Sequence, residues 1–437
     1  MRLIRILKYD LCREVATWVA EGIISANQAE SICSQYGVDY HNLSRRSYGY
    51  QVLVGLGCLF IGLSLITLIG ANWDEIPRAI RMSSLVALTL GANVFGLIKF
   101  RREQKSTAVA LFFLGGLFYG ASIILIAQIY HIGEHYPDGI FWWAIGVLPV
   151  AVLLESTLIM VLTVGLGFIW FFVESSMNFY PTLFPVFLIA MFWHLNRGKQ
   201  SNILFLVLVV GVGIWSEYTL AWMIGEKNEF QPGAENVALG MGLFLFFHGL
   251  SRWLVERNEH MLSDYGTLLG LWVLRFIIIT LFIFSFEEPW RELIKAEWHM
   301  VGLTITLSLL LSALALWLAY QARKSLFSTI AFALLFNISL VAVMLVEDKV
   351  YGSAFQFADN IVLVGVGIWL IVRGIQSSIS HYFYAGVLVI LATGLLRYID
   401  LIGDYIGASI LFAILASILL LSAKYWKNHH DKAGEIS

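Results

Sequence analysis

The chain has 437 residues, of which 59% are apolar and only 13% are charged, and its formal net charge is −2. A soluble domain carries about 25% charged residues, and a chain this apolar could not keep a wettable exterior in water. The composition therefore excludes an ordinary soluble protein and predicts a polytopic membrane protein. Its apolar runs are repeatedly long enough for the about 20 residues that one spanning helix needs.

The chain opens with a segment that predicts a small helical hairpin. Apolar residues recur at helical spacing from Leu11 to Val19, and Gly22 marks the end of that helix. Ser25, with Gln28 three residues later, has the pattern of a capping box that begins a second helix. Two interpretations remain open: a docking module for another protein, and a helical pair lying against the base of the membrane domain.

The rest of the chain predicts an all-α, polytopic transmembrane helical bundle of about 14 spans, with a range of 12 to 14. We expect a cytoplasmic helical hairpin over residues 1–48, the transmembrane helical domain over 49–428 and a cytoplasmic tail over 429–437. The expected spans are 52–71, 80–98, 107–130, 139–154, 157–173, 179–194, 202–224, 236–254, 265–286, 299–319, 325–346, 358–373, 379–398 and 404–426. The fourth, sixth and twelfth are short, so tilted, re-entrant or half-helices are alternatives there.

The distribution of basic residues predicts the orientation. With the N-terminus inside, 20 of the 28 Lys and Arg residues lie on the cytoplasmic side and 7 on the other, and Arg275 lies within a span. The positive-inside rule therefore places both termini in the cytoplasm. We expect no cleavable signal peptide, because Asp10, Arg13 and Glu14 precede any apolar core.

An internal echo predicts a repeated two-helix unit near the start of the chain. Residues 56–67 match residues 114–125 at seven of twelve positions, and glycines are among the matches. Glycines on one helix face permit close helix packing in a membrane, so the first two pairs of spans are expected to be parallel copies of one unit.

The turns that leave the first and third spans form the first candidate site. If the two-helix units lie side by side, these turns meet in a polar patch at the outer surface. The candidate residues are Asn72, Trp73, Asp74, Arg78, Gln128, Tyr130, His131 and Asp138. The structural alternative is an interfacial belt, because Trp, Tyr and His sit at headgroup level and Asn and Asp cap helix ends.

One part of this turn resembles a zinc-ligand pattern. The run from His131 to His135 has the H-x-x-E-H order, which binds metal when a helix places both His on one face. Gly133 inside the run and Pro137 after it disfavour such a helix. We therefore expect no metal site.

Ionisable residues within spans form the second candidate site. Glu217 and Arg275 lie in two spans that both run outward, at depths that a long Arg side chain can bridge. An unpaired charge at the bilayer centre costs about 2.5–3.5 kcal/mol or more, so each should have a partner or water. A solute or proton pathway and a structural ion pair are both open. For His248, Asn93 and Asn337 we expect hydrogen bonds between helices.

Several sequence blocks resemble the bacterial membrane proteins grouped as domain of unknown function 2157. They are Glu21-Gly-Ile-Ile-Ser-Ala-Asn-Gln-Ala29, Gly70-Ala-Asn-Trp-Asp-Glu-Ile-Pro-Arg78, Ala127-Gln-Ile-Tyr-His-Ile-Gly133 and Pro137-Asp-Gly139. The resemblance covers roughly residues 10–155. It implies a multi-pass protein of the bacterial inner (cytoplasmic) membrane and supplies no reaction.

These observations favour a transporter or permease-like protein with a polar outer-face site. The alternatives are a non-catalytic envelope accessory or sensing protein and, third, a membrane enzyme that acts on a lipid-linked substrate through His131 and Asp138. The sequence has no Gly-rich phosphate loop, no Cys-x-x-Cys pair and no Gly-x-Ser-x-Gly elbow. We therefore expect no cofactor and no nucleic-acid partner; the expected partners are the lipid bilayer and an unknown small molecule or membrane protein.

Overall fold

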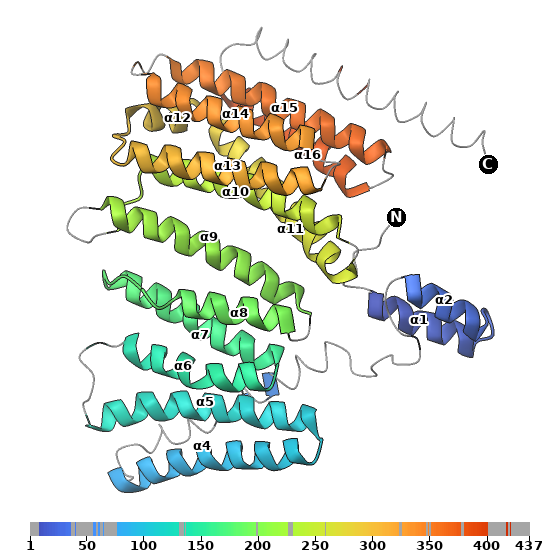
Figure 1. Cartoon of the computed structure of the whole chain (residues 1–437), viewed down its shortest axis with the longest axis vertical. Coiled ribbons are helices and arrows are strands. Elements are labelled where there is room, and N and C mark those ends of the chain that lie inside the picture. The colour runs from blue at the N-terminus through green and yellow to red at the C-terminus, as the bar shows by residue number, and fades with distance from the viewer. Residues whose placement is uncertain are drawn as a thin grey trace. The chain divides into compact units, whose positions relative to one another are not determined.

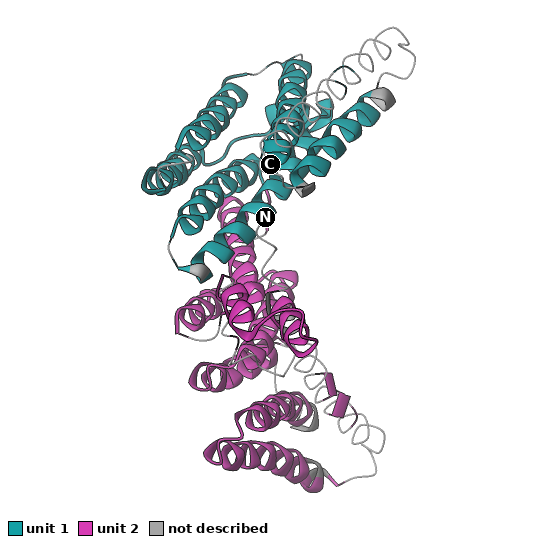
Figure 2. Cartoon of the chain, turned by 90° about the vertical axis from the view of Figure 1, so that its right-hand side faces the viewer, with its two compact units in different colours: residues 1–8, 233–437 teal, residues 9–232 magenta. Residues whose placement is uncertain are grey.

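The computed structural model describes residues 8–35, 77–130, 137–197, 200–225, 230–257, 259–322, 326–346, 351–376 and 380–400, with a few single positions such as His135 between them. Every regular element in these ranges is a helix, so the prediction of an all-α bundle is confirmed (Figure 1). The helices fall into two compact units, residues 9–232 (unit 2) and residues 1–8 with 233–437 (unit 1), which Figure 2 shows in different colours.

The N-terminal hairpin forms as the sequence predicts. Helix α1 (Lys8–Ala20) and helix α2 (Ala26–Gln35) are joined by a turn in which Gly22 has φ +75°, a conformation that suits glycine. The capping box is present: the Ser25 backbone N donates to Gln28 Oε1 at 2.9 Å, and the Gln28 backbone N donates to Ser25 Oγ at 3.4 Å. The hairpin closes a small core of its own, with Cys12, Val15, Ala29 and Cys33 fully buried.

From residue 77 onward the described part of unit 2 has six helices, which follow one another in sequence order with alternating direction (Figure 1). They are α4 (Arg78–Arg101), α5 (Lys105–Tyr130), α6 (Pro137–Leu153), α7 (Thr157–Ser176), α8 (Pro185–Arg197) and α9 (Asn202–Ile224). Successive helices contact each other, because short turns favour antiparallel neighbours. The α5–α6 and α7–α8 turns therefore share one end of the unit, which the charge distribution predicts to be the outer one. We call this the expected outer end.

Glycines of unit 2 receive large side chains of the neighbouring helix. A Cβ at Gly120 of α5 would lie 2.0 Å from the Trp143 ring of α6, and a Cβ at Gly146 of α6 would lie 2.2 Å from the Tyr119 ring of α5. An aromatic ring of each helix thus lies against a glycine of the other helix. At these two glycines the space is filled by rings of the other helix. The expected close helix packing in a repeated unit stays a prediction, because residues 56–67 lie mostly outside the described residues.

The described part of unit 1 contains seven helices. They are α10 (Ala234–Val255), α11 (His260–Phe284), α12 (Glu287–Lys295), α13 (Val301–Gln321), α14 (Leu326–Leu345), α15 (Gly352–Gln376) and α16 (Ser380–Asp400). Helix α10 contacts α11, α13 and α14, while α15 packs along α16. At the α15–α16 seam the backbones nearly touch, since a Cβ at Gly386 would lie 2.6 Å from the Gly367 carbonyl oxygen.

The predicted spans are matched wherever the structure describes them. Each range from 80–98 to 379–398 overlaps a helix, and nine helices of the described part are long and apolar enough to cross a membrane. The first and last expected spans, 52–71 and 404–426, lie mostly outside the described residues, so the count of fourteen stays a prediction.

Three details of the span prediction change or gain precision. The fourth and sixth are indeed short, as α6 has 17 residues and α8 has 13. The twelfth is not short: α15 has 25 residues, because the run Gly352–Phe357 continues the helix toward its N-terminus. The sequence reasoning also missed α12, a nine-residue helix with Glu287, Glu288, Arg291, Glu292 and Lys295 on a charged face.

Candidate functional site

Little of the predicted outer-face patch can be placed. Asn72, Trp73, Asp74 and His131 lie outside the described residues. The backbones of Arg78, Gln128 and Tyr130 belong to the ends of α4 and α5, and Asp138 is exposed in the first turn of α6. Whether the two turns meet therefore stays a prediction.

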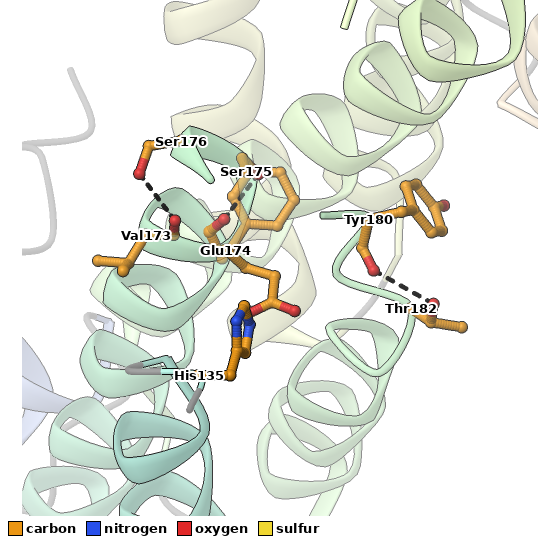
Figure 3. Close-up of polar contacts among 8 residues, drawn as sticks. His135, Val173, Glu174, Ser175, Ser176, Tyr180 and Thr182 are labelled. Atoms are coloured by element: carbon orange, nitrogen blue, oxygen red, sulfur yellow. Dashed lines mark hydrogen bonds and ion pairs between the residues drawn. The ribbon is translucent and has the colours of Figure 1, made fainter. Parts of the chain in front are cut away.

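A polar pair that the sequence reasoning missed does lie at this end of unit 2. His135 Nε2, from the α5–α6 turn, is 2.9 Å from Glu174 Oε2 in the last turn of α7 (Figure 3). The two side chains are only 23% and 12% exposed. The His135 ring also meets the edge of Phe179, with ring centroids 4.5 Å apart. The pair therefore fastens the α5–α6 turn to the end of α7.

The position of Glu174 explains why it needs such a partner. A carboxylate in the last turn of a helix faces the negative end of the helix dipole, which disfavours its charge. The same turn is closed by two hydroxyl groups, since Ser175 Oγ donates to the Phe171 carbonyl at 2.6 Å and Ser176 Oγ donates to the Val173 carbonyl at 2.7 Å. A histidine that donates to Glu174 offsets the unfavourable dipole. An acidic residue directly after an apolar run was the sequence signal available for it.

Stacked aromatic rings fill the space beside this pair. Tyr218 of α9 stacks on Phe230 with centroids 5.1 Å apart and on Tyr180 at 6.2 Å. Tyr180 Oη and Thr219 Oγ1 are 2.7 Å apart, which ties the α7–α8 turn to α9. In Figure 3 the Tyr180 ring points away from His135 and Glu174. Because these rings pack against one another, we interpret this region as closely packed and structural.

The described residues give no support to a metal site. Within the described ranges no group of three His, Cys, Asp or Glu side chains lies close enough to hold an ion. His131 and Glu134 of the H-x-x-E-H run are outside those ranges. His135, the last residue of the run, is engaged with Glu174 instead.

The proposed intramembrane pair falls in different units. Glu217 belongs to α9 of unit 2 and Arg275 to α11 of unit 1. Arg275 is exposed on its helix and its guanidinium lies over the Trp272 ring, 5.0 Å from the ring centroid. The pairing of Glu217 with Arg275 stays a prediction.

Of the three polar residues expected to link helices, one does so by a direct bond. Asn337 Nδ2 of α14 donates to Ser312 Oγ of α13 at 2.9 Å, which confirms the expectation. Asn93 Nδ2 instead donates to the Thr89 carbonyl of its own helix, while its side chain fills the space at Gly115 of α5. His248 Nε2 makes no hydrogen bond within the described residues.

A second polar cluster joins three helices of unit 1, and the sequence reasoning did not find it. Its centre is Ser285, the residue that ends α11. The Ser285 carbonyl accepts hydrogen bonds from Gln356 Nε2 and Asn360 Nδ2 of α15, both at 3.1 Å. Arg397 of α16 reaches Ser285 Oγ at 3.5 Å. The Asp359 carboxyl group of α15 lies close enough to Arg397 to interact with it electrostatically. We call Ser285, Gln356, Asp359, Asn360 and Arg397 the Ser285 cluster.

Asp359 is the least accessible charged group of this cluster. Asp359 is only 8% exposed, and its Oδ2 atom makes no hydrogen bond within the described residues. Asn360 Oδ1 is likewise buried without a hydrogen bond. The sequence placed Asp359 at the edge of a short span, but α15 begins at Gly352, so Asp359 lies about 10 Å along the helix at 1.5 Å per residue.

A further buried carboxylate, Glu235, has a structural role. Glu235 is fully buried at the start of α10, and its Oε1 accepts the backbone N–H groups of His299 at 2.5 Å and Met300 at 3.0 Å. These N–H groups precede α13, where a helix leaves its donors unpaired. Glu235 therefore caps α13 from the neighbouring helix.

The comparisons with known proteins identify a family for the first third of the chain. Residues 16–160 match the family described as "Predicted membrane protein (DUF2157)", which agrees with the resemblance over residues 10–155. No curated protein and no solved structure matches the chain. The match covers α1 to the start of α7, so the His135 turn lies inside it and the Ser285 cluster lies outside it.

Proposed function

We propose that this multi-pass membrane protein is a permease-like carrier of a small polar solute, and that the solute passes the Ser285 cluster of unit 1. The observation that carries the proposal is Asp359, a buried carboxyl group within a 25-residue apolar helix. Ionisable groups within spans are costly, and in membrane proteins they mark solute pathways and proton relays.

The chemistry of the cluster indicates what kind of solute it would receive. Two acceptor atoms, Asp359 Oδ2 and Asn360 Oδ1, are buried without hydrogen bonds in the described part of the chain. A buried acceptor without a donor costs about 1–3 kcal/mol, and a solute or water that donates hydrogen bonds would recover this cost. A cationic or donor-rich solute fits these atoms better than an anion.

The second half of the route would run along the same helix toward its other end. Arg373 lies fourteen residues after Asp359 on α15, about four turns, which returns to nearly the same helix face. Its guanidinium lies over the rings of Trp369 at 5.1 Å and Tyr382 at 5.9 Å. Between the levels of Asp359 and Arg373, the glycines Gly367 and Gly386 bring α15 and α16 into backbone contact. We infer that this contact between α15 and α16 closes the route to the solute in the conformation described.

The alternative is a non-catalytic accessory or sensing protein, favoured by the self-contained core of the N-terminal hairpin. Both functions are compatible with a helical membrane domain, and they differ in whether water reaches the Ser285 cluster. A carrier needs an aqueous route to it, whereas a scaffold does not.

Thiol accessibility tests this difference without a known solute. Cys12, Cys33 and Cys58 are first replaced by Ser, and Asn360→Cys is then introduced into the full-length protein in sealed membrane vesicles. A charged, membrane-impermeant thiol reagent should modify Asn360→Cys at least about tenfold faster than the controls, a barrier difference of about 1.4 kcal/mol.

Two cysteine variants on the same helix give the reference rates of thiol modification. Leu363 is fully buried and Ile361 is 59% exposed, so Leu363→Cys reports protein interior and Ile361→Cys reports lipid. If Asn360→Cys reacts no faster than these two from either side of the membrane, the carrier proposal is wrong and the accessory function is preferred.

A further inference from the structure

A groove on the surface of unit 1 has the chemistry of a phospholipid site. It has a volume of about 540 Å³ and is lined by apolar residues of three helices: Ile279, Phe282, Ile283, Phe286, Pro289 and Leu396. Ligand sites commonly have volumes of about 300–1,000 Å³ and combine an apolar lining with a few placed polar groups. The groove supplies the apolar part of such a site.

The open side of the groove faces the surface of the unit. Ile279 and Ile283 of α11 are each 53% exposed. On a helix that is long and apolar enough to cross a membrane, such residues face lipid chains. An acyl chain can therefore enter the groove directly from the bilayer.

A positive charge lies against one of the residues that line the groove. The Arg397 guanidinium is stacked over the ring of Phe286, a lining residue, 5.0 Å from the ring centroid. A planar guanidinium presents several N–H donors and binds phosphate oxygens well. Arg397 is only three residues from the end of α16, so its side chain lies near the level at which headgroups are expected.

Helix α12 independently marks that level. Its charged residues lie on one face, while Trp290 on the other face donates to the Phe284 carbonyl at 2.6 Å and stacks on Phe355 at 5.1 Å. Amphipathic helices of this kind lie at the boundary between headgroups and acyl chains. Pro289 of α12 lines the groove, so we place the groove next to the headgroup level that α12 marks.

The charges on α12 indicate that recognition depends on the phosphate group itself. Glu287 is paired with Arg291 at 2.9 Å, and Glu292 with Lys295 at 2.6 Å. This helix therefore offers no surplus of positive charge with which to select lipids by their net charge. The specific donor at the groove is Arg397.

We propose that one phospholipid molecule occupies this groove, with an acyl chain against Ile279, Phe286 and Leu396 and its phosphate on the Arg397 guanidinium. This site shares Arg397 with the Ser285 cluster, but the lipid proposal does not depend on the solute route proposed above. The bound lipid would hold the end of α16 against α11 and α12.

Lipid retention by the full-length protein in detergent tests the proposal. Native mass spectrometry would compare phosphatidylglycerol with a diacylglycerol that has the same chains and no phosphate. The protein should bind phosphatidylglycerol about tenfold more tightly, a difference of about 1.4 kcal/mol. Inorganic phosphate at the same concentration should not compete, because it has no chain for the groove.

Three variants separate the two parts of the site. Arg397→Gln should abolish the preference for phosphatidylglycerol over diacylglycerol, and Arg397→Lys should keep part of it. Leu396→Trp should fill the groove and weaken both lipids, whereas the control Leu309→Trp, at a 57% exposed position of α13, should weaken neither. Equal binding of the two lipids by the unchanged protein would overturn the proposal, as would unchanged retention in Leu396→Trp.

Discussion

The indole nitrogen of Trp143 donates a hydrogen bond to the carbonyl oxygen of Gly116, 2.8 Å away on the neighbouring helix. This bond is possible because Gly120, one turn further along α5, has no side chain where the Trp143 ring lies. A helix carbonyl is already paired within its helix, so an additional donor from α6 fixes the rotation of the two helices.

The first prediction concerns this contact. Gly120→Ala should destabilise unit 2 by about 1–3 kcal/mol, because the new Cβ would lie 2.0 Å from the Trp143 ring and the ring must leave its place. Thermal unfolding in detergent, followed by tryptophan fluorescence, measures the loss. The matched control is Gly165→Ala on α7, which meets no atom within 4 Å and should leave stability unchanged or slightly higher. Equal effects of the two changes would contradict the assigned contact.

The α15–α16 seam should be less tolerant still. At Gly374 a Cβ would lie 2.5 Å from the backbone nitrogen of Phe383, and backbone cannot rotate away as a side chain can. We expect Gly374→Ala to cost at least the upper part of the about 1–3 kcal/mol range for overpacking. Gly365→Ala on the same helix meets nothing within 4 Å and serves as its control. A Gly374→Ala protein with unaltered melting temperature would refute the close approach.

The bond between His135 and Glu174 predicts an energetic coupling across unit 2. Glu174→Gln and His135→Asn, made singly and together, should show a coupling energy of about 0.5–3 kcal/mol in a double-mutant cycle of unfolding. Asp138→Asn is the matched control, since Asp138 is exposed in the first turn of α6, three residues after His135, and should change stability by less than about 0.5 kcal/mol. Strict additivity of the two single changes would mean that the pair contributes nothing.

Glu235 should be needed as the cap of α13. Glu235→Ala removes the acceptor of the His299 and Met300 backbone N–H groups and should cost about 1–3 kcal/mol of stability. Glu235→Gln keeps an acceptor oxygen and should cost less. Hydrogen exchange at the start of α13, measured by mass spectrometry, should rise in the Ala variant more than in the Gln variant. Glu256→Ala provides a control for removing an exposed carboxylate, at the residue that follows α10.

The predicted orientation has a direct test. Reporter domains that are active on only one side of the membrane can be fused after Gln200 and after Ser437, which the basic residues place in the cytoplasm. A phosphatase that is active only outside the cytoplasm should be silent at both sites and active when inserted after Asp138. Activity at either cytoplasmic site would reverse the orientation and with it the meaning of the expected outer end.

The sequence by itself determined the helical membrane architecture and the local devices within it. Apolar runs of spanning length and the Ser25–Gln28 capping box are short-range features, and both appear in the described part of the chain. Only the tertiary structure decided which helix faces meet. Asn360 and Ser285 are 75 residues apart, and Glu235 and His299 are 64 residues apart, so no local pattern announces either contact. The physical reason is that lipid-facing and helix-facing surfaces are equally apolar in a membrane protein. Hydropathy therefore shows where a helix crosses, whereas close fit at glycines and a few polar bonds select its neighbours.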